Sequence, residues 1–319
     1  MARFIVRRLA GMVLVLFAIS VIVFLIFSVI PSDPAARIAG KNATPLLIEN
    51  VEHTWGFDDP LPVQYLTTMK LIFTGELVSY SSQLNVVEQI VEGVPATFSL
   101  CIGAAVIWLF FGILFGYLSA VKAGRVTDRL LTILALIGIS IPVFWLAAIL
   151  LYYFTFKIQL FPSGGYVPLT EDPVQWAYHL VLPWLTLAVL FIGFYSRVLR
   201  SNMLDVMNED YVRTARAKGL SERQVHSRHV LRNSLVPIVT LFGLDFGYVI
   251  GGGTVFTELI FNLHGVGQYA AEAIGDLDLP PIMAVTMFGA FFIVLFNTVV
   301  DIAYAYLDPR IRLGEETTR

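Results

Sequence analysis

Long apolar runs separated by shorter polar segments form the main pattern along this 319-residue chain. An α-helix needs about 20 mostly apolar residues to cross the hydrocarbon core of a bilayer. Six windows reach that length, and they lie at residues 9–30, 96–121, 130–156, 176–196, 235–260 and 282–307. The pattern therefore predicts an all-α membrane protein with six transmembrane helices. The first apolar run is longer than a signal-peptide core, so we expect that helix to be retained.

The windows divide the chain into four predicted regions. These are an N-terminal tip with the first helix (1–30), a long external segment (31–94), a core of five further helices (95–309) and a tail (310–319). The external segment is rich in aromatic and aliphatic residues as well as proline, which argues against plain disorder. Apolar residues that follow Pro62 at helical spacing favour a short helix at the membrane interface. Pro142 is predicted to kink the third span.

Basic residues set the predicted orientation, because the cytoplasmic side of a membrane protein carries an excess of Lys and Arg close to the spans. With the N-terminus inside, nearly all of the 21 Lys and Arg residues fall in the N-terminal tip, the second-to-third and fourth-to-fifth connections, and the tail. The exceptions are Arg37, Lys41, Lys70 and Lys157. We therefore expect both termini to be cytoplasmic.

The composition mainly excludes certain partners and kinds of site. Charged residues make up 14 % of the chain, against about a quarter in soluble domains, and the net charge of −3 indicates no nucleic-acid partner. The single cysteine, Cys101, lies in an apolar run, so we expect a buried thiol rather than a disulfide or a metal site. The five histidines are dispersed, and neither an H-E-x-x-H nor a G-x-S-x-G motif occurs. No catalytic and no metal-ligating residue is predicted.

The connection between the fourth and fifth spans, residues 197–234, is too long for a turn and too charged for a span. Gly219 stands where a helix C-cap favours a residue with positive φ. Ser221 and Gln224 form the pattern of a capping box that opens a second helix. The segment therefore predicts two helices with a sharp joint, which would suit a rigid knob that docks on a cytoplasmic partner. A solvated basic loop and a DNA-reading helix-turn-helix are the alternatives.

The fifth span carries two further patterns. Gly243, Gly247 and Gly251 recur every four residues, which predicts a stripe for close helix packing. Asp245 lies about 200° around the same helix from Gly243, and an ionisable group inside a membrane commonly faces a cavity or a partner. We predict Asp245, Tyr248 and Gly252 as candidates for a translocation pathway. A structural ion pair or an interfacial position is the alternative for Asp245, and a structural role is favoured for Asp301.

Four segments in order along the chain carry a resemblance to a known family. They are GFDDPLPVQY at 56–65, PSGGY at 162–166, the run 210–237 containing DYVRTARAKGLS and HVLRNSLVP, and YAYLDPRI at 304–311. Together they resemble the permeases of binding-protein-dependent ABC importers, and within these the first permease subunit of the dipeptide, oligopeptide and nickel group. Arg213-Thr214-Ala215 replaces the Glu-Ala-Ala of the broader importer pattern, which is similar to the peptide group. His264-Gly265 departs from its usual Pro-Gly.

The resemblance implies a type I ABC importer permease fold in the plasma membrane of a prokaryote, with this chain forming half of the pathway. The implied partners are a homologous second permease, two cytoplasmic ATPase subunits, an external substrate-binding protein and membrane lipid. The chain has no phosphate-binding G-x-x-x-x-G-K-[ST] loop, so ATP and Mg²⁺ are expected on the ATPase subunits and no cofactor on this chain. Asp210, Tyr211, Ala215, Arg216 and Gly219 are the expected coupling surface.

Peptides are the expected cargo, with nickel chelates or glutathione-like molecules as alternatives. Two other classes of protein are weighed against this interpretation. A secondary transporter or channel would favour internal repeats and several intramembrane charges, and neither is evident in the sequence. A membrane enzyme would need converging catalytic side chains, which the motif search does not find.

Overall fold

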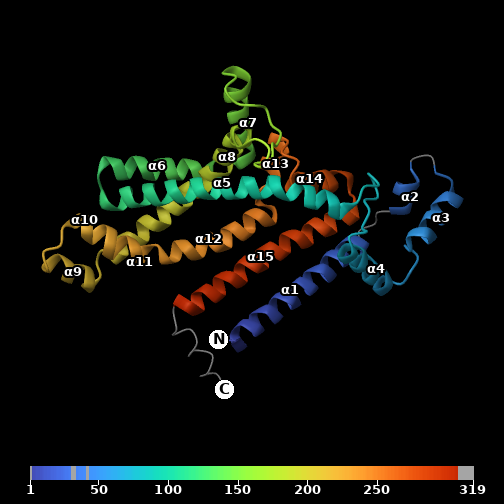
Figure 1. The fold of residues 1–319 in the computed structure, drawn as a ribbon, viewed down its shortest axis with the longest axis horizontal. Coiled ribbons are helices and arrows are strands. Elements are labelled where there is room, and N and C mark those ends of the chain that lie inside the picture. Colours follow the sequence, from blue (N-terminus) through green and yellow to red (C-terminus); the bar gives the residue numbers. More distant parts are fainter. Residues whose placement is uncertain (1, 30–33, 41–42, 308–319) are drawn as a thin grey trace. The chain divides into compact units, whose positions relative to one another are not determined.

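The computed structural model describes residues 2–29, 34–40 and 43–307. The predicted tail 310–319 and the last four residues of the 304–311 motif lie outside these ranges. Across the described ranges all regular elements are helical, apart from an isolated bridge between Val78 and Asn85. The chain divides into two compact units, residues 1–97 with 250–255 and 264–319, and residues 98–249 with 256–263. Figure 1 shows the helices of both units.

The first unit is built around two long helices. α1 (Ala2–Val29) and α15 (Leu279–Leu307) lie side by side, and α14 (Val266–Asp276) packs on α15 (Figure 1). The segment 31–94, which is predicted to be external, adds α2 (Pro34–Ala39), α3 (Pro45–Trp55) and α4 (Leu61–Thr74). The helix predicted after Pro62 is thus confirmed as α4, whereas its position at a membrane interface stays a prediction.

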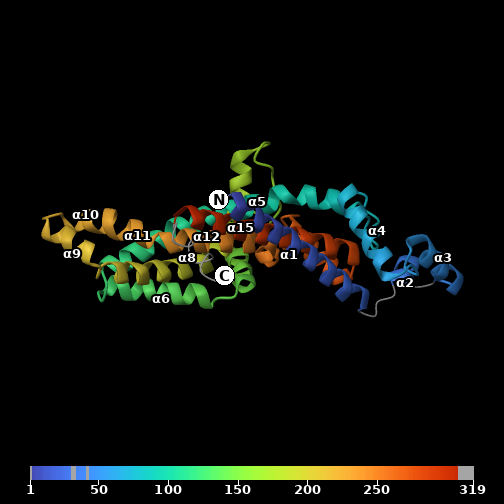
Figure 2. The same cartoon turned by 90° about the horizontal axis from the view of Figure 1, so that it is seen from below.

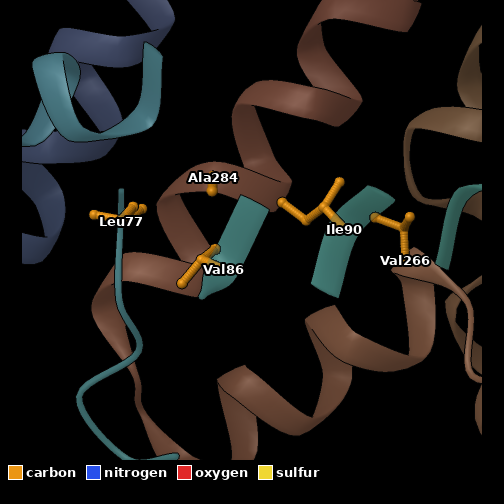
Figure 3. Close-up of a cluster of buried hydrophobic side chains, with 5 residues drawn as sticks. All are labelled: Leu77, Val86, Ile90, Val266 and Ala284. Atoms are coloured by element: carbon orange, nitrogen blue, oxygen red, sulfur yellow. The ribbon is translucent and has the colours of Figure 1, made fainter. Parts of the chain in front are cut away.

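A small apolar core holds the segment 31–94 to the helices of this unit. Figure 3 shows it as Leu77, Val86, Ile90, Val266 and Ala284. Beside it, the Asp278 carboxylate accepts hydrogen bonds from the Ser79 hydroxyl at 2.5 Å and from the Tyr80 and Ser81 backbone N–H groups at 3.0 and 3.1 Å. These contacts fix residues 79–81 at the start of α15. Burial, with a smaller contribution from the Asp278 charge, raises the pKa of Tyr80.

The second unit is built from helices between α5 and α13. In chain order they are α5 (Val86–Val121, which starts in the first unit), α6 (Val126–Ser140), α7 (Val143–Leu150), the π-helical η1 (Leu151–Lys157), α8 (Pro173–Val206), α9 (Asp210–Ala217), α10 (Glu222–Gln224), the π-helical η2 (Val225–Leu231), α11 (Arg232–Ser234), α12 (Val236–Tyr248) and α13 (Val255–Phe261). Trp108, Tyr195 and Leu199 are fully buried at its centre. A Cβ on Gly112 would lie 2.8 Å from that of Tyr195, so this glycine lets α5 approach α8 closely.

The structure has five or six candidate spans where the sequence predicts six, and two of them are not single helices. Five helices are long and apolar enough to cross a membrane in the part of the chain that the structure describes, and a bent pair supplies a sixth if it counts as one span. That pair, α6 with α7 and η1, turns by 100° at Ile141-Pro142. Proline disfavours helical geometry in the residue before it and lacks an N–H to continue the ladder. The predicted kink is therefore a complete break.

The fifth window, 235–260, is also wrong as a single helix. α12 ends at Tyr248, the π-helical η3 (Val249–Gly253) follows, and Gly252 has φ 154° before α13 begins. Only glycine adopts this backbone region readily, so the break is encoded at that residue. Two helix boundaries also differ from the predicted ones. α5 begins at Val86, inside the predicted external segment, and α8 runs ten residues beyond the predicted end at 196.

Candidate functional site

The joint predicted at Gly219 is present and closed by backbone hydrogen bonds. The Gly219 N–H donates to the Arg216 carbonyl at 2.9 Å, and the Leu220 N–H donates to the Ala215 carbonyl at 3.4 Å. Gly219 has φ 82°, the left-handed conformation of such a helix end. The pattern is a Schellman motif, and it ends α9 in one defined direction.

The second helix starts with the predicted capping box. The Ser221 N–H donates to Gln224 Oε1 at 3.2 Å, and the reciprocal side-chain cap is formed as well. The Arg216 guanidinium bridges the joint, with Nε 2.9 Å from Glu222 Oε1. The Arg216 side chain is therefore already engaged inside this element. We call residues 210–234, from α9 to α11, the hairpin; Figures 1 and 2 both place it at one tip of the second unit.

An apolar underside holds the hairpin together. Val212, Val225 and Val230 are fully buried, and α9 and α8 both pack on η2. Ala215 is only 5 % exposed and belongs to this underside. Ala215 therefore faces the hairpin's own core, and its contribution to a docking surface stays a prediction.

The outer face of the hairpin is polar and exposed. Asp210 is exposed and pairs with Arg213 at 3.2 Å, while a Cβ added at Gly219 would meet no atom within 4 Å. Tyr211 is 42 % exposed, and its hydroxyl accepts a hydrogen bond from Asn233 Nδ2 at 2.8 Å. An open depression lies beside Tyr211, lined also by Ser227, Arg228, His229, Arg232 and Asn233. Asp210, Tyr211, Arg216 and Gly219 thus lie exposed, and their contact with a partner stays a prediction.

A buried ion pair that the sequence analysis did not single out fixes α8 near the hairpin. Asp128, at the start of α6, is 4 % exposed and accepts from Arg200 Nε at 2.7 Å and Nη2 at 2.9 Å. The Ser119 hydroxyl and the Gly124 N–H donate to the same carboxylate at 2.5 and 2.8 Å. This cluster joins α5, the 122–125 turn, α6 and α8. Its sequence signal is an acidic residue at the head of a span, directly after a basic turn.

The pathway candidates do not share one environment. Asp245 Oδ2 accepts a hydrogen bond from the buried Tyr195 hydroxyl at 2.8 Å, in α12 and α8 of the second unit. The hydrogen-bond partner that the structure shows for Asp245 is thus a phenol. Tyr248 is 59 % exposed at the end of α12. Gly252, in the first unit, lines a largely apolar pocket of about 310 Å³.

The glycine pattern is explained at one position. A Cβ on Gly251 would lie 2.8 Å from the carbonyl oxygen of Gly289 in α15, so the two backbones touch within the first unit. Gly247 is buried and Gly243 half-buried in the second unit. A packing stripe through Gly243 and Gly247 stays a prediction. Asp301 pairs with Arg8 of α1 at 2.7 Å, as expected for a structural role.

The arrangement offers docking and packing rather than chemistry. Among the described residues no group of three or more His, Cys, Asp or Glu side chains is placed to hold a metal ion. Cys101 is buried, as expected. The exposed outer face of the hairpin offers a surface on which a partner can dock.

Comparison with known proteins identifies the family. The profile of the binding-protein-dependent transport system inner membrane component matches residues 112–313, and the profile of the N-terminal part of such membrane components matches residues 1–101. A probable peptide ABC transporter permease of Sinorhizobium fredii is 37 % identical over 98 % of this chain and 100 % of its own length. A probable D,D-dipeptide transport system permease of Escherichia coli K12 is 37 % identical over 97 % of both chains.

A third relative, a glutathione transport system permease of Escherichia coli O6:H1, is 37 % identical over 98 % of this chain and 99 % of its own. These matches cover both units and the whole of the hairpin. The chain therefore belongs to the family of binding-protein-dependent transport system inner membrane components, and it is a multi-pass permease subunit of that family.

Proposed function

We propose that this permease subunit imports di- or oligopeptides and forms half of the translocation pathway, with a homologous permease as the other half. Two ATPase subunits would bind the hairpin's side of the complex, and an external binding protein would deliver the cargo. ATP and Mg²⁺ would be held by the ATPase subunits. The full-length similarity to a peptide and a dipeptide permease supports the peptide cargo.

The observation that carries the coupling role is the closure of the hairpin joint. Transmission of motion between two states needs an element that moves as a rigid body. Residues 215–224 are held together by the Schellman motif, the capping box and the Arg216–Glu222 ion pair. The outer face of the hairpin remains exposed. The Asp128–Arg200 cluster then connects α8, which leads into the hairpin, to the helices α5 and α6. We propose that movement of the ATPase subunits enters the membrane helices along this route.

The proposed orientation puts the hairpin and both termini in the cytoplasm. It rests on the distribution of Lys and Arg, most of which lie in the tip, the segment 122–129, the hairpin and the tail. The long external segment would then face the binding protein. Cysteine labelling with a membrane-impermeant reagent tests this directly, because Gly219→Cys should react only in inverted vesicles.

Asp245 is proposed as the cargo-contacting residue of the pathway. A carboxylate inside the membrane can attract the amino terminus of a peptide, and the Tyr195 hydroxyl would hold it in position. Tyr248 and Gly252 complete the proposed pathway set.

One cargo alternative has a specific observation behind it, since the glutathione permease is as similar as the dipeptide permease. The decisive experiment is uptake into proteoliposomes that contain this chain, its second permease and the ATPases. Dipeptides, oligopeptides, glutathione and a nickel chelate would be supplied in turn with the binding protein. ATP-dependent uptake of peptides supports the proposal. Uptake that continues without ATP would favour a secondary transporter, and uptake of glutathione alone would reassign the cargo.

A further inference from the structure

A polar pocket at one end of the first unit has no part in the proposed function. It has a volume of about 490 Å³ and lies between the N-terminal part of α1 and the C-terminal part of α15. Its lining consists of Arg7, Arg8, Gly11, Met12, Val15, Val294, Asn297, Thr298 and Asp301. The pocket is thus formed entirely by two neighbouring helices of one unit.

The lining is polar toward the ends of the helices and apolar further in. Two arginines, one asparagine and one threonine line the same space as a single aspartate. The Arg8–Asp301 ion pair, at 2.7 Å, ties α1 to α15 at this point. Guanidinium groups bind phosphate oxygens through paired, charge-assisted hydrogen bonds, and Gly11 leaves space where a side chain would otherwise project. Met12, Val15 and Val294 then offer an apolar floor.

The depth of the pocket indicates where its ligand comes from. The candidate spans in these two helices are Ile5–Ile26 and Leu279–Ile302. Arg7 and Arg8 lie in the first turn of one span and Asp301 in the last turn of the other, so the polar end of the pocket lies at the edge of the hydrocarbon core. That is the depth of lipid headgroups. The charge distribution predicts that this edge is the cytoplasmic one, and basic pockets between helices on that side bind anionic headgroups.

The surface next to the pocket suits acyl chains. Val15, which lines the pocket, is 44 % exposed in the isolated chain, and Leu14 beside it on α1 is 68 % exposed. We propose that this pocket binds the phosphate of an anionic phospholipid, with Arg7 and Thr298 as ligands and the acyl chains along α1. The proposal does not depend on the cargo or on the coupling route.

The test uses the full permease complex, purified and exchanged into mixed micelles of phosphatidylglycerol and phosphatidylcholine. Native mass spectrometry then counts the lipid molecules retained by each complex. Arg7→Gln should lower retained phosphatidylglycerol by about tenfold, because it removes a charge-assisted hydrogen bond. Thr298→Val should lower retained phosphatidylglycerol by a smaller factor. This variant changes no charge, so the number of basic residues that directs membrane insertion stays the same. Arg125→Gln changes an exposed basic residue outside the pocket and should leave retention unchanged.

Three outcomes would overturn the proposal. Equal retention of phosphatidylglycerol and phosphatidylcholine would exclude an anionic site, and undiminished retention in both Arg7→Gln and Thr298→Val would exclude this pocket. Displacement of phosphatidylglycerol by inorganic phosphate added to the micelles would assign a small-anion site instead. Because lipid retention is measured without transport, failure here leaves the proposed function untouched.

Discussion

Arg200 of α8 donates two hydrogen bonds to Asp128 of α6, from Nε to Oδ1 at 2.7 Å and from Nη2 to Oδ2 at 2.9 Å. The geometry is the paired arrangement in which a guanidinium recognises a carboxylate most strongly. The carboxylate is nearly fully buried and takes two further donors, Ser119 and Gly124, so its lone pairs are well satisfied. Loss of one partner therefore leaves a buried charge, which is the costly case for an ion pair.

We expect Arg200→Gln to destabilise the second unit by about 3 kcal/mol, because breaking a buried pair typically costs 3–5 kcal/mol and Arg200 is partly exposed. Asp128→Asn should cost a comparable amount. The double variant should lose less than the sum, since neither charge is then left alone. Thermal unfolding of the purified chain in detergent measures all three. Additive losses would show that the two side chains do not act as a pair.

The same variants test the route of coupling. If α8 transmits motion from the hairpin, Arg200→Gln should reduce peptide uptake per ATP hydrolysed while the complex still assembles. Arg197→Gln is the matched control, because it removes a charge from the same helix outside the Asp128 cluster. An unchanged ratio of uptake to hydrolysis in Arg200→Gln would restrict the ion pair to a structural role.

Gly219 offers a separate test of the hairpin. Its φ of 82° is unfavourable for a β-branched residue, yet a Cβ there meets nothing within 4 Å. Gly219→Val should therefore strain the joint by roughly 1–3 kcal/mol without any steric clash. Gly219→Asn should be tolerated, because asparagine adopts this backbone region more readily. We expect ATP-driven uptake to fall in Gly219→Val and to persist in Gly219→Asn, with normal membrane insertion of both. Unchanged uptake in Gly219→Val would contradict a coupling role for the joint.

How far the sequence predicts this fold depends on the range of the contacts. The Gly219 joint and the Ser221–Gln224 capping box depend on residues a few positions apart, and both were predictable. The apolar windows likewise located the membrane helices. Burial of Ala215 was not predictable, because it depends on how α9 packs on η2. The Asp128–Arg200 pair joins residues 72 positions apart, and no local pattern connects them.

The breaks at Pro142 and Gly252 show a second limit of prediction from the sequence. Both windows are apolar enough on average to pass as a single span, so mean hydropathy does not separate one helix from two. The residues that cause the breaks are visible in the sequence, but proline also occurs within intact helices of this chain, as Pro95 in α5 and Pro183 in α8 show. Whether a proline bends or breaks a helix depends on the neighbouring helices that satisfy the freed backbone groups.

The contact between Gly251 and Gly289 predicts that a residue larger than glycine does not fit at position 251, next to the break between α12 and α13. A Cβ on Gly251 would meet the Gly289 carbonyl oxygen and the Ile293 side chain at 2.8 Å, and both neighbours belong to α15. We expect Gly251→Ala to destabilise the first unit by about 1–3 kcal/mol through overpacking. Gly275→Ala is the control, because Gly275 lies in α14 with open space around it and alanine favours helix by about 0.5–1 kcal/mol. Opposite signs for the two variants in thermal unfolding would support the contact, and equal stabilisation would contradict it.

Asp245 allows the pathway proposal to be separated from a purely structural role. Asp245→Asn keeps the shape of the side chain and can still accept a hydrogen bond from Tyr195, but it removes the negative charge. If the carboxylate attracts the amino terminus of the cargo, uptake of a free dipeptide should fall by about tenfold, the loss expected for a charge-assisted contact. Uptake of the N-acetylated dipeptide should not change.

Tyr195→Phe removes the hydrogen bond but leaves the charge, so it should lower stability by about 1 kcal/mol and preserve the preference for a free amino terminus. If Asp245→Asn reduces uptake of the free and the N-acetylated dipeptide equally, the carboxylate serves the packing of α8 against α12 and does not bind the amino terminus of the cargo.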